Sequence, residues 1–105
     1  MYIEYDQEYL WELYTKGKTS DKKHRYQPEV IRGYQKAVFV LSSAKRIEDL
    51  FLNHSLNYEA LQGDKKGISS VRINKKYRLE FTVKEIKHEQ IITCCRLLDI
   101  SNHYK

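Results

Sequence analysis

The sequence contains few of the residues that break or brace a folded chain. Its 105 residues include four glycines, one proline and two cysteines, and they show no internal repeat or low-complexity segment. A chain of this length can bury one core without disulfides, so residues 1–105 are predicted to form a single domain. Long apolar runs are also missing. We therefore expect no transmembrane helix, no signal peptide and no membrane contact, which points to a cytoplasmic protein.

The two cysteines are too few and too close together for a disulfide framework. Cys94 and Cys95 are neighbours, and neighbouring side chains of a strand point to opposite faces, so a bond between them would be strained. Both are predicted to be free thiols in a sheet. The sequence has no Ser-His-Asp arrangement, no phosphate-binding glycine loop and no His/Cys spacing typical of zinc, so no metal and no cofactor is expected.

Positive charge is present in excess. The chain has 19 Lys and Arg against 14 Asp and Glu, a formal net charge of +5. Such a balance favours an anionic partner without identifying it.

The first half of the chain shows helical periodicity. After a short expected strand at residues 2–5, Asp6 is predicted to cap a helix that Gly17 ends. The polar segment 16–25 has no periodicity and is predicted to be a loop. A second helix should begin with Pro28 in its first turn. Its apolar stripe consists of Val30, Tyr34, Ala37, Val38 and Leu41.

From Leu56 onward the hydrophobic period changes to two, the period of a β-strand. The expected strands are residues 58–61, 69–73, 77–83 and 91–100. The last of them has apolar residues on both faces, so it is predicted to be central and covered on both sides. Two helices followed by an antiparallel sheet make an α+β fold.

The segment "SVRINKKYRLEF", residues 70–81, reads as a hairpin whose register can be predicted. A loop of two residues would pair a charged side chain with an apolar one. A loop of three residues, 74–76, pairs Arg72 with Arg78 and Val71 with Leu79, and keeps one face apolar. This register places two arginines directly opposite each other, which is unfavourable for a sheet by itself.

The facing arginines predict a surface that binds phosphates. Four lysines in two neighbouring turns add to its charge, namely Lys65, Lys66, Lys75 and Lys76. The structural alternative is that Glu80, diagonal to Arg72, neutralises the pair. A polyanion resting on this face would instead turn the repulsion into recognition. We therefore interpret the hairpin as an RNA-binding or ribosome-binding platform.

The C-terminal sequence adds groups that can transfer protons. His103 titrates near neutral pH and can act as a general acid or base, and Tyr104 can stack on a base or hold a proton. RNA supplies its own nucleophile, the 2′-hydroxyl, so cleavage needs only proton transfer and positive charge from the protein. These residues could therefore support a metal-free reaction on RNA.

The segment "EALQGDKKGISSVRINKKYRLEF", residues 59–81, together with the C-terminal "LLDISNHYK", resembles the HigB-type toxins of the RelE/ParE superfamily. The resemblance rests on the Leu-x-Gly-Asp-x-x-Gly turn and on the Ser-(Val/Ile)-Arg-Ile-Asn-x-x-(Tyr/Trp)-Arg hairpin. It implies a RelE-like fold, in which two N-terminal helices pack on a small twisted antiparallel sheet. It also implies a toxin of a bacterial type II toxin–antitoxin pair, a ribosome-dependent endoribonuclease that cleaves mRNA in the ribosomal A site. The implied partner is a cognate helix-turn-helix antitoxin of the HigA type.

The resemblance also implies roles for single residues. Arg78 matches the arginine that meets the scissile phosphate, and His103 matches a histidine near the family's C-terminus. Glu59 stands where some members have a histidine, and Tyr104 can replace the family's tyrosine. By alternation Glu59 shares the side of Leu61, which is expected to face the core. We therefore rank His103 above Glu59 as the acid–base group.

Two other functions stay open at this stage. A ParE-like toxin would inhibit a topoisomerase and would not need His103. A non-catalytic module would only bind RNA or its antitoxin.

Overall fold

One five-stranded sheet and three α-helices make up the fold of this computed structural model, which describes residues 1–87 and 89–102. The strands are β1 (Tyr2–Tyr5), β2 (Glu59–Ala60), β3 (Ser69–Arg72), β4 (Tyr77–Lys87) and β5 (Ile91–Asn102). The helices are α1 (Glu8–Lys16), α2 (Pro28–Ser43) and α3 (Glu48–Phe51). The sheet order is β1-β5-β4-β3-β2, and all pairs are antiparallel except β1 with β5. The α+β prediction is confirmed.

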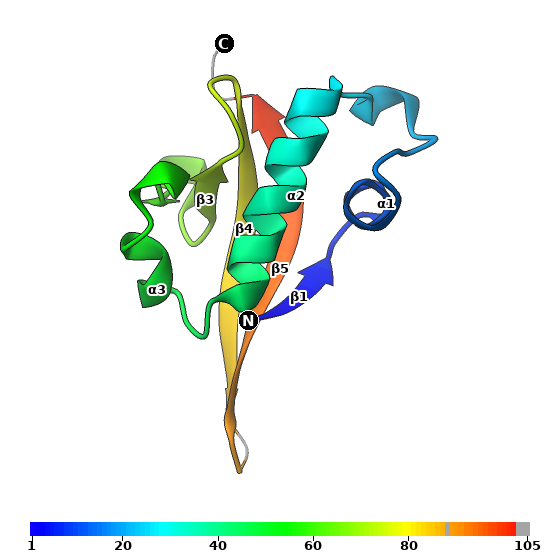
Figure 1. Cartoon of the computed structure of the whole chain (residues 1–105). Helices are drawn as coiled ribbons and strands as arrows, with labels where there is room; N and C mark the ends of the chain where they lie inside the picture. The colour runs from blue at the N-terminus through cyan, green and yellow to red at the C-terminus, as the bar shows by residue number, and fades with distance from the viewer. Residues whose placement is uncertain (88, 103–105) are drawn as a thin grey trace.

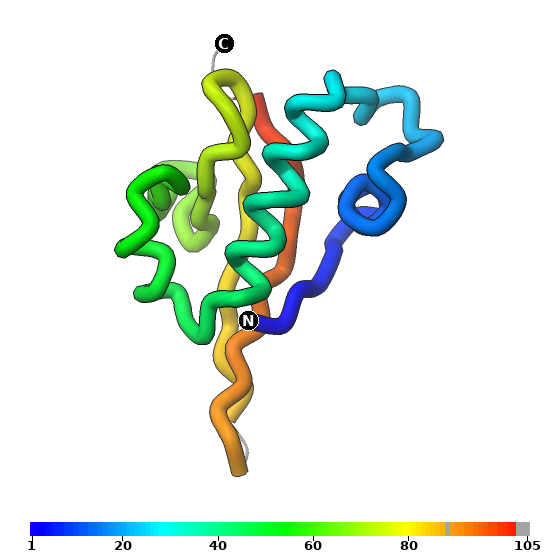
Figure 2. The backbone as a smooth tube through the Cα atoms, in the orientation of Figure 1, coloured from blue at the N-terminus to red at the C-terminus, as the bar shows by residue number. Residues whose placement is uncertain are grey.

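The two long helices cover one face of the sheet. In Figure 1, α2 runs along β4 and β5, and α1 lies beside it near β1. The tube in Figure 2 shows the β4–β5 hairpin extending well below the helices. All five residues of the predicted stripe on α2 are buried, and four of them, Tyr34, Ala37, Val38 and Leu41, pack with Leu10, Leu13, Phe81 and Leu97 in a single core. The helix stripe was therefore predicted correctly.

Both helix boundaries that involve a special residue agree with the prediction. Gly17 follows α1 in the left-handed conformation, with φ of 71°, and its N–H donates to the Leu13 carbonyl. Pro28 occupies the first turn of α2. Gly33 has a further role, because a Cβ there would lie 2.7 Å from the Ile73 carbonyl oxygen. The absence of a side chain allows α2 to approach the β3–β4 hairpin.

The predicted cap at Asp6 is wrong. The N-cap of α1 is Gln7, and its side chain makes no capping hydrogen bond. Asp6 instead accepts two hydrogen bonds from Arg96 of β5, at 2.9 and 3.1 Å. The Asp6 carboxylate, which the local sequence assigned to the helix end, therefore binds a cation on a strand that is distant in sequence. The predicted loop at 16–25 also differs, since it contains a 3₁₀ turn at Lys22–His24.

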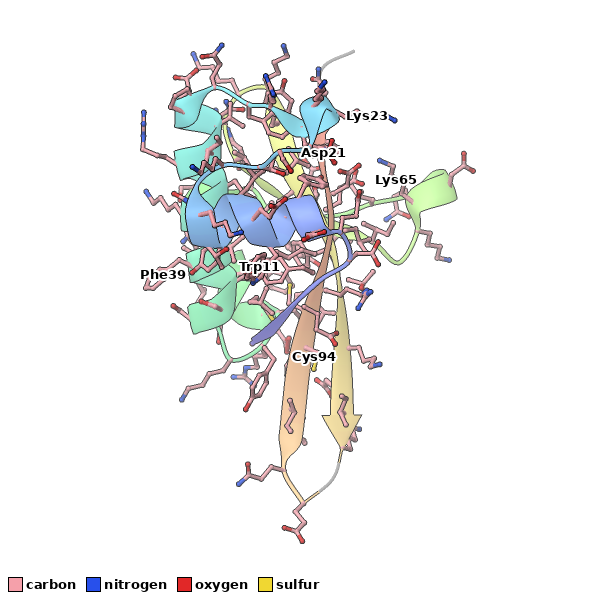
Figure 3. The ribbon with its side chains drawn as sticks, turned by 90° about the vertical axis from the view of Figure 1, so that its right-hand side faces the viewer. Trp11, Asp21, Lys23, Phe39, Lys65 and Cys94 are labelled. Carbon is pink, nitrogen blue, oxygen red and sulfur yellow. The ribbon has the colours of Figure 1, made fainter. Side chains whose placement is uncertain are left out.

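The predicted double coverage of the last strand is also wrong, and a β-bulge explains the sequence pattern. Glu80 pairs with Asp99 and Phe81 with Leu97, so Leu98 is an extra residue in β5. The bulge reverses the alternation, and Leu97 and Ile100 both join the core although they are three positions apart. The strand lies inside the sheet between β1 and β4, but α1 and α2 lie on only one of its faces (Figure 3).

Candidate functional site

The predicted hairpin register is confirmed. Arg72 pairs with Arg78 and Val71 with Leu79, and a tight loop at 74–76 connects β3 to β4. Asn74 stabilises this loop, because its side-chain oxygen accepts hydrogen bonds from the backbone N–H groups of residues 76 and 77, at 2.9 and 2.8 Å. The apolar face of the hairpin therefore faces the core, and the two arginines share the opposite face.

Arg78 is not on an open surface. It is only 6% exposed, and its guanidinium is held by three hydrogen bonds to neighbouring groups. Nε donates to the Ser70 hydroxyl at 2.9 Å, and Nη2 donates to the Ser70 carbonyl at 3.3 Å and to the Asn57 carbonyl. The sequence analysis placed this side chain on a phosphate-binding surface, but the structure buries it. Alternation predicts which face a residue takes, but not which neighbouring segment covers it.

Burial and two charged neighbours shift the pKa of Arg78. Burial lowers the pKa of the guanidinium, and the positive charge of Arg72 lowers it further, while the negative charge of Glu59 raises it. An arginine remains protonated at neutral pH in spite of such shifts. The fold thus holds a fixed positive charge, partly desolvated, at the base of this face.

Glu59 lies on the same face as Arg78, contrary to the prediction. In β2 it pairs with Ser70, which pairs in turn with Glu80. Together with Arg78 it lines a cavity of about 230 Å³. The other residues of this wall are Leu61, Gln62, Lys65, Ser70, Glu80, Ser101 and Asn102. We call this cavity the arginine pocket. Alternation correctly placed Glu59 and Leu61 on one side of the strand, but Leu61 lines the pocket rather than the core.

The arginine pocket contains balanced charges. Lys65 Nζ lies 2.6 Å from the carboxylate of Glu80, whose side chain is only 11% exposed. Figure 3 shows Lys65 on the opposite side of the sheet from Trp11 and Phe39. The structural alternative was that Glu80 neutralises the Arg72–Arg78 pair. In the structure its partner is Lys65 instead. With Glu59 and Arg78, the pocket offers two cations and two carboxylates, a set that can bind a phosphate and accept a proton.

The four lysines of the predicted basic platform lie in separate parts of the structure. Lys65 belongs to the arginine pocket, and Lys66 is exposed on the turn that follows it. Lys75 and Lys76 line a second, larger cavity of about 860 Å³, on the side of the hairpin that faces the start of α2. The four lysines therefore do not form one continuous surface with the arginines.

A cluster of titratable side chains that the sequence analysis missed lies beside the end of β5. The Tyr9 hydroxyl donates to Asp99, and the ring of His24 stacks on that of Tyr9 at a centroid distance of 3.5 Å. His24 Nδ1 lies 3.0 Å from Asp21, and its Nε2 lies 3.9 Å from Asp99. Burial and the Asp99 carboxylate raise the pKa of Tyr9. The polar sequence neighbours of His24 give no signal of this packing.

The predicted residues His103 and Tyr104 lie outside the described residues, so their place relative to the pocket stays a prediction. Cys94 and Cys95 are free thiols, as predicted, and Cys95 is buried. Within residues 1–87 and 89–102, no group of three His, Cys, Asp or Glu side chains is arranged to hold a metal ion. No helix in this part of the chain is long and apolar enough to cross a membrane.

Comparisons with known proteins agree with the hairpin motif. Residues 3–93 match the model of the HigB-like toxins, described as RelE-like toxins of the type II toxin–antitoxin system HigB. Toxin HigB-1 of Vibrio cholerae serotype O1 is 34% identical over 85 residues, which cover 77% of this chain and 82% of that protein.

Solved structures share the fold at low sequence identity. A YoeB/ParE toxin from Agrobacterium tumefaciens superposes with a TM-score of 0.58 at 18% identity, over 99% of this chain and all of that one. YafQ from Escherichia coli BL21(DE3) gives a TM-score of 0.52 at 14% identity, over 96% and 91% of the two chains. These likenesses establish the RelE-type fold, and the family match establishes more. The chain belongs to the HigB family of RelE-like toxins, the toxin components of type II toxin–antitoxin systems.

Proposed function

We propose that this toxin is a ribosome-dependent endoribonuclease that cleaves mRNA in the ribosomal A site without a metal ion. The observation that carries the proposal is that a buried, fixed guanidinium and a carboxylate, those of Arg78 and Glu59, line one small cavity. Cleavage of RNA at a phosphate needs both kinds of group. The cation stabilises the charge that develops on the phosphorus oxygens, and a base removes the proton of the nucleophile.

The reaction follows from the chemistry of RNA. The 2′-hydroxyl loses its proton to a base and its oxygen forms a bond to phosphorus, while the bond from phosphorus to the 5′-oxygen of the next nucleotide breaks. The leaving 5′-oxygen takes a proton from a general acid. The products are a 2′,3′-cyclic phosphate and a 5′-hydroxyl, and no external oxidant or metal is required.

Arg78 is the group that we assign to the phosphate. Its hydrogen bonds to Ser70 and Asn57 use Nε and Nη2, so Nη1 is not engaged in that set. The three bonds fix the plane of the guanidinium before substrate binds. A donor that is already oriented stabilises a transition state without further ordering.

Proton transfer is assigned to Glu59 and His103. Because Glu59 lines the arginine pocket, the geometric reason for ranking it below His103 no longer holds. We assign Glu59 as the base for the 2′-hydroxyl and His103 as the acid for the leaving oxygen, with Tyr104 beside it. The lysine turns then contribute affinity for the ribosome and its RNA rather than chemistry.

One observation favours a second function, a non-catalytic module that binds RNA or its antitoxin. The three hydrogen bonds of Arg78 all go to protein groups, which is also what a purely structural arginine would show. If Arg78 were purely structural, the pocket would only stabilise the fold. The toxin would then act by occupying the A site without cleaving mRNA.

The test is single-turnover cleavage of mRNA on programmed ribosomes, with analysis of the RNA ends. We expect a 2′,3′-cyclic phosphate at the new 3′ end. Glu59→Gln and His103→Gln should each lower the rate by about 10²-fold or more and leave ribosome binding unchanged, as expected for lost acid–base catalysis. Gln62→Glu adds a carboxylate to the same wall and serves as a control for pocket charge. Ribosome binding without any cleavage by the wild-type toxin would instead establish the non-catalytic function.

A further inference from the structure

A second cavity is separate from the arginine pocket. It lies between the segment that leads into α2 and the tip of the β3–β4 hairpin, and it has a volume of about 860 Å³. Small-ligand pockets in proteins typically have volumes of about 300–1,000 Å³. Figure 1 shows these two segments close to each other at one end of the molecule, beside the end of β5. We call this cavity the hairpin cavity.

Positive charge dominates the wall of the hairpin cavity. Arg25, Lys75 and Lys76 line it and are exposed, and Glu29 is the one carboxylate among its lining residues. The cations come from two segments far apart in sequence, so the fold rather than a local charge run gathers them. An excess of exposed cations around a cavity favours an anionic ligand.

Two aromatic rings give this cavity a second property. Tyr26 and Tyr77 both line it and meet edge to face, with ring centroids 5.2 Å apart and planes at 77°. Both are half-buried and pack against the core, so the rings are held in place. Lys76 Nζ lies 5.6 Å from the centroid of the Tyr77 ring. Fixed aromatic rings beside flexible cations are the combination that binds single-stranded nucleic acid.

Two consecutive residues of one strand line the hairpin cavity and the arginine pocket. Tyr77 and Arg78 are consecutive residues of β4 and therefore point to opposite faces of the sheet. The former lines the hairpin cavity and the latter lines the arginine pocket. A single strand that crosses the tip of the hairpin could thus contact both places at once.

We propose that the hairpin cavity binds one nucleotide of single-stranded RNA, with its base against the rings of Tyr26 and Tyr77 and its phosphate on Lys75, Lys76 and Arg25. This inference rests on the proposed function, since it assigns the cavity to the RNA on which the arginine pocket acts. An acidic peptide would use the cations but would gain little from the two fixed rings. RNA uses both.

The charge arm of the test measures binding of a fluorescein-labelled single-stranded RNA of about eight nucleotides by anisotropy at several salt concentrations. Lys75→Ala/Lys76→Ala should flatten the slope of log affinity against log salt by about 1.4, for two lost phosphate contacts. Lys84→Ala/Lys87→Ala removes two exposed lysines from the other end of β4 and should leave the slope unchanged. Equal effects from the two pairs would overturn the proposal.

The stacking arm compares this RNA with an abasic oligonucleotide of the same length. Tyr26→Leu should weaken binding of the RNA by about 5- to 150-fold, the range for one stacked base, and should not change binding of the abasic strand. Tyr26→Phe keeps the ring and should bind both as the wild type does. Thermal unfolding of each variant checks that the half-buried position still folds. Unchanged RNA affinity in a folded Tyr26→Leu variant would refute stacking in the cavity.

Two further results separate this inference from its alternatives. If poly-L-glutamate displaced the RNA at the same concentration of negative charge as unlabelled RNA, the cavity would be a general anion site and the proposal would be wrong. Binding of the oligonucleotide is measured without ribosomes. RNA binding with the predicted pattern in a chain that does not cleave mRNA would therefore uphold this inference and reject only the endonuclease.

Discussion

Replacing Arg78 should damage both stability and activity, and the two effects can be measured separately. Arg78→Ala removes three hydrogen bonds and leaves the Ser70 hydroxyl and two carbonyl oxygens without their donor. A buried polar group without a partner costs about 1–3 kcal/mol. Since the arginine pocket is open to water, we take the lower end for each acceptor. The free energy of unfolding should fall by about 2–4 kcal/mol, measured by urea denaturation followed by circular dichroism.

Arg72→Ala is the matched control. It removes the same charge from the same face at the residue paired with Arg78, and it relieves a repulsion between like charges. A substitution of this kind away from buried hydrogen bonds typically changes stability by no more than about 0.5 kcal/mol. The two variants therefore separate loss of a charge from loss of a bonded network. If they destabilised the fold equally, the three bonds would not be what makes Arg78 important.

The catalytic effect is measured where the variant is still folded. Arg78→Ala should lower single-turnover cleavage on ribosomes by about 10²–10³-fold, the usual loss for one electrostatic donor. Arg78→Lys keeps the charge but lacks the planar fork, so it should recover part of the rate and little of the stability. A folded Arg78→Ala variant that cleaves within a few-fold of the wild-type rate would refute the assignment to the phosphate.

Three other predictions follow from the fold and its charges. Gly33→Ala should lower the free energy of unfolding by about 1 kcal/mol. The added Cβ would lie 2.7 Å from the Ile73 carbonyl oxygen, and this overpacking outweighs the gain in helix propensity. A more stable variant would contradict this prediction. Burial raises the pKa of Cys95 to about 12 from 9.0, so the unfolded state loses this proton first as pH rises above 9. Stability should therefore fall by up to about 1.4 kcal/mol per pH unit between these values, and Cys95→Val should lack this component. A further variant replaces four lysines with alanine, namely Lys65, Lys66, Lys75 and Lys76. Because Lys65 is already paired, the salt slope of ribosome binding should flatten by about 2 rather than by the full four-contact value, and an unchanged slope would show that these lysines bind no phosphate.

The sequence determined the local geometry of this protein. The register of the β3–β4 hairpin was predictable because only one loop length keeps its faces unmixed, and the structure has that register. The end of α1 at Gly17 and the start of α2 at Pro28 follow from the backbone conformations that these two residues prefer. The motif around the hairpin was also sufficient to identify the HigB family. Each of these features depends on residues close together in the chain.

Tertiary structure alone decided the composition of the site. Alternation grouped Glu59 with Leu61 but could not choose their face, because that depends on the pairing of β2 with β3. The bulge at Leu98 and the parallel pairing of β1 with β5 are likewise relations between strands distant in sequence.

The burial of Arg78 has the same origin. Its acceptors belong to β3 and to the turn at Asn57, 8 and 21 residues away in the chain. The lysines of the hairpin tip were assigned to the arginine face, yet they line a cavity with Arg25 and Tyr26 on the other side. A sequence pattern fixes the direction of a side chain relative to its own strand. Which segment covers that side chain, and whether its charge is neutralised, depends on contacts between segments that the pattern does not contain.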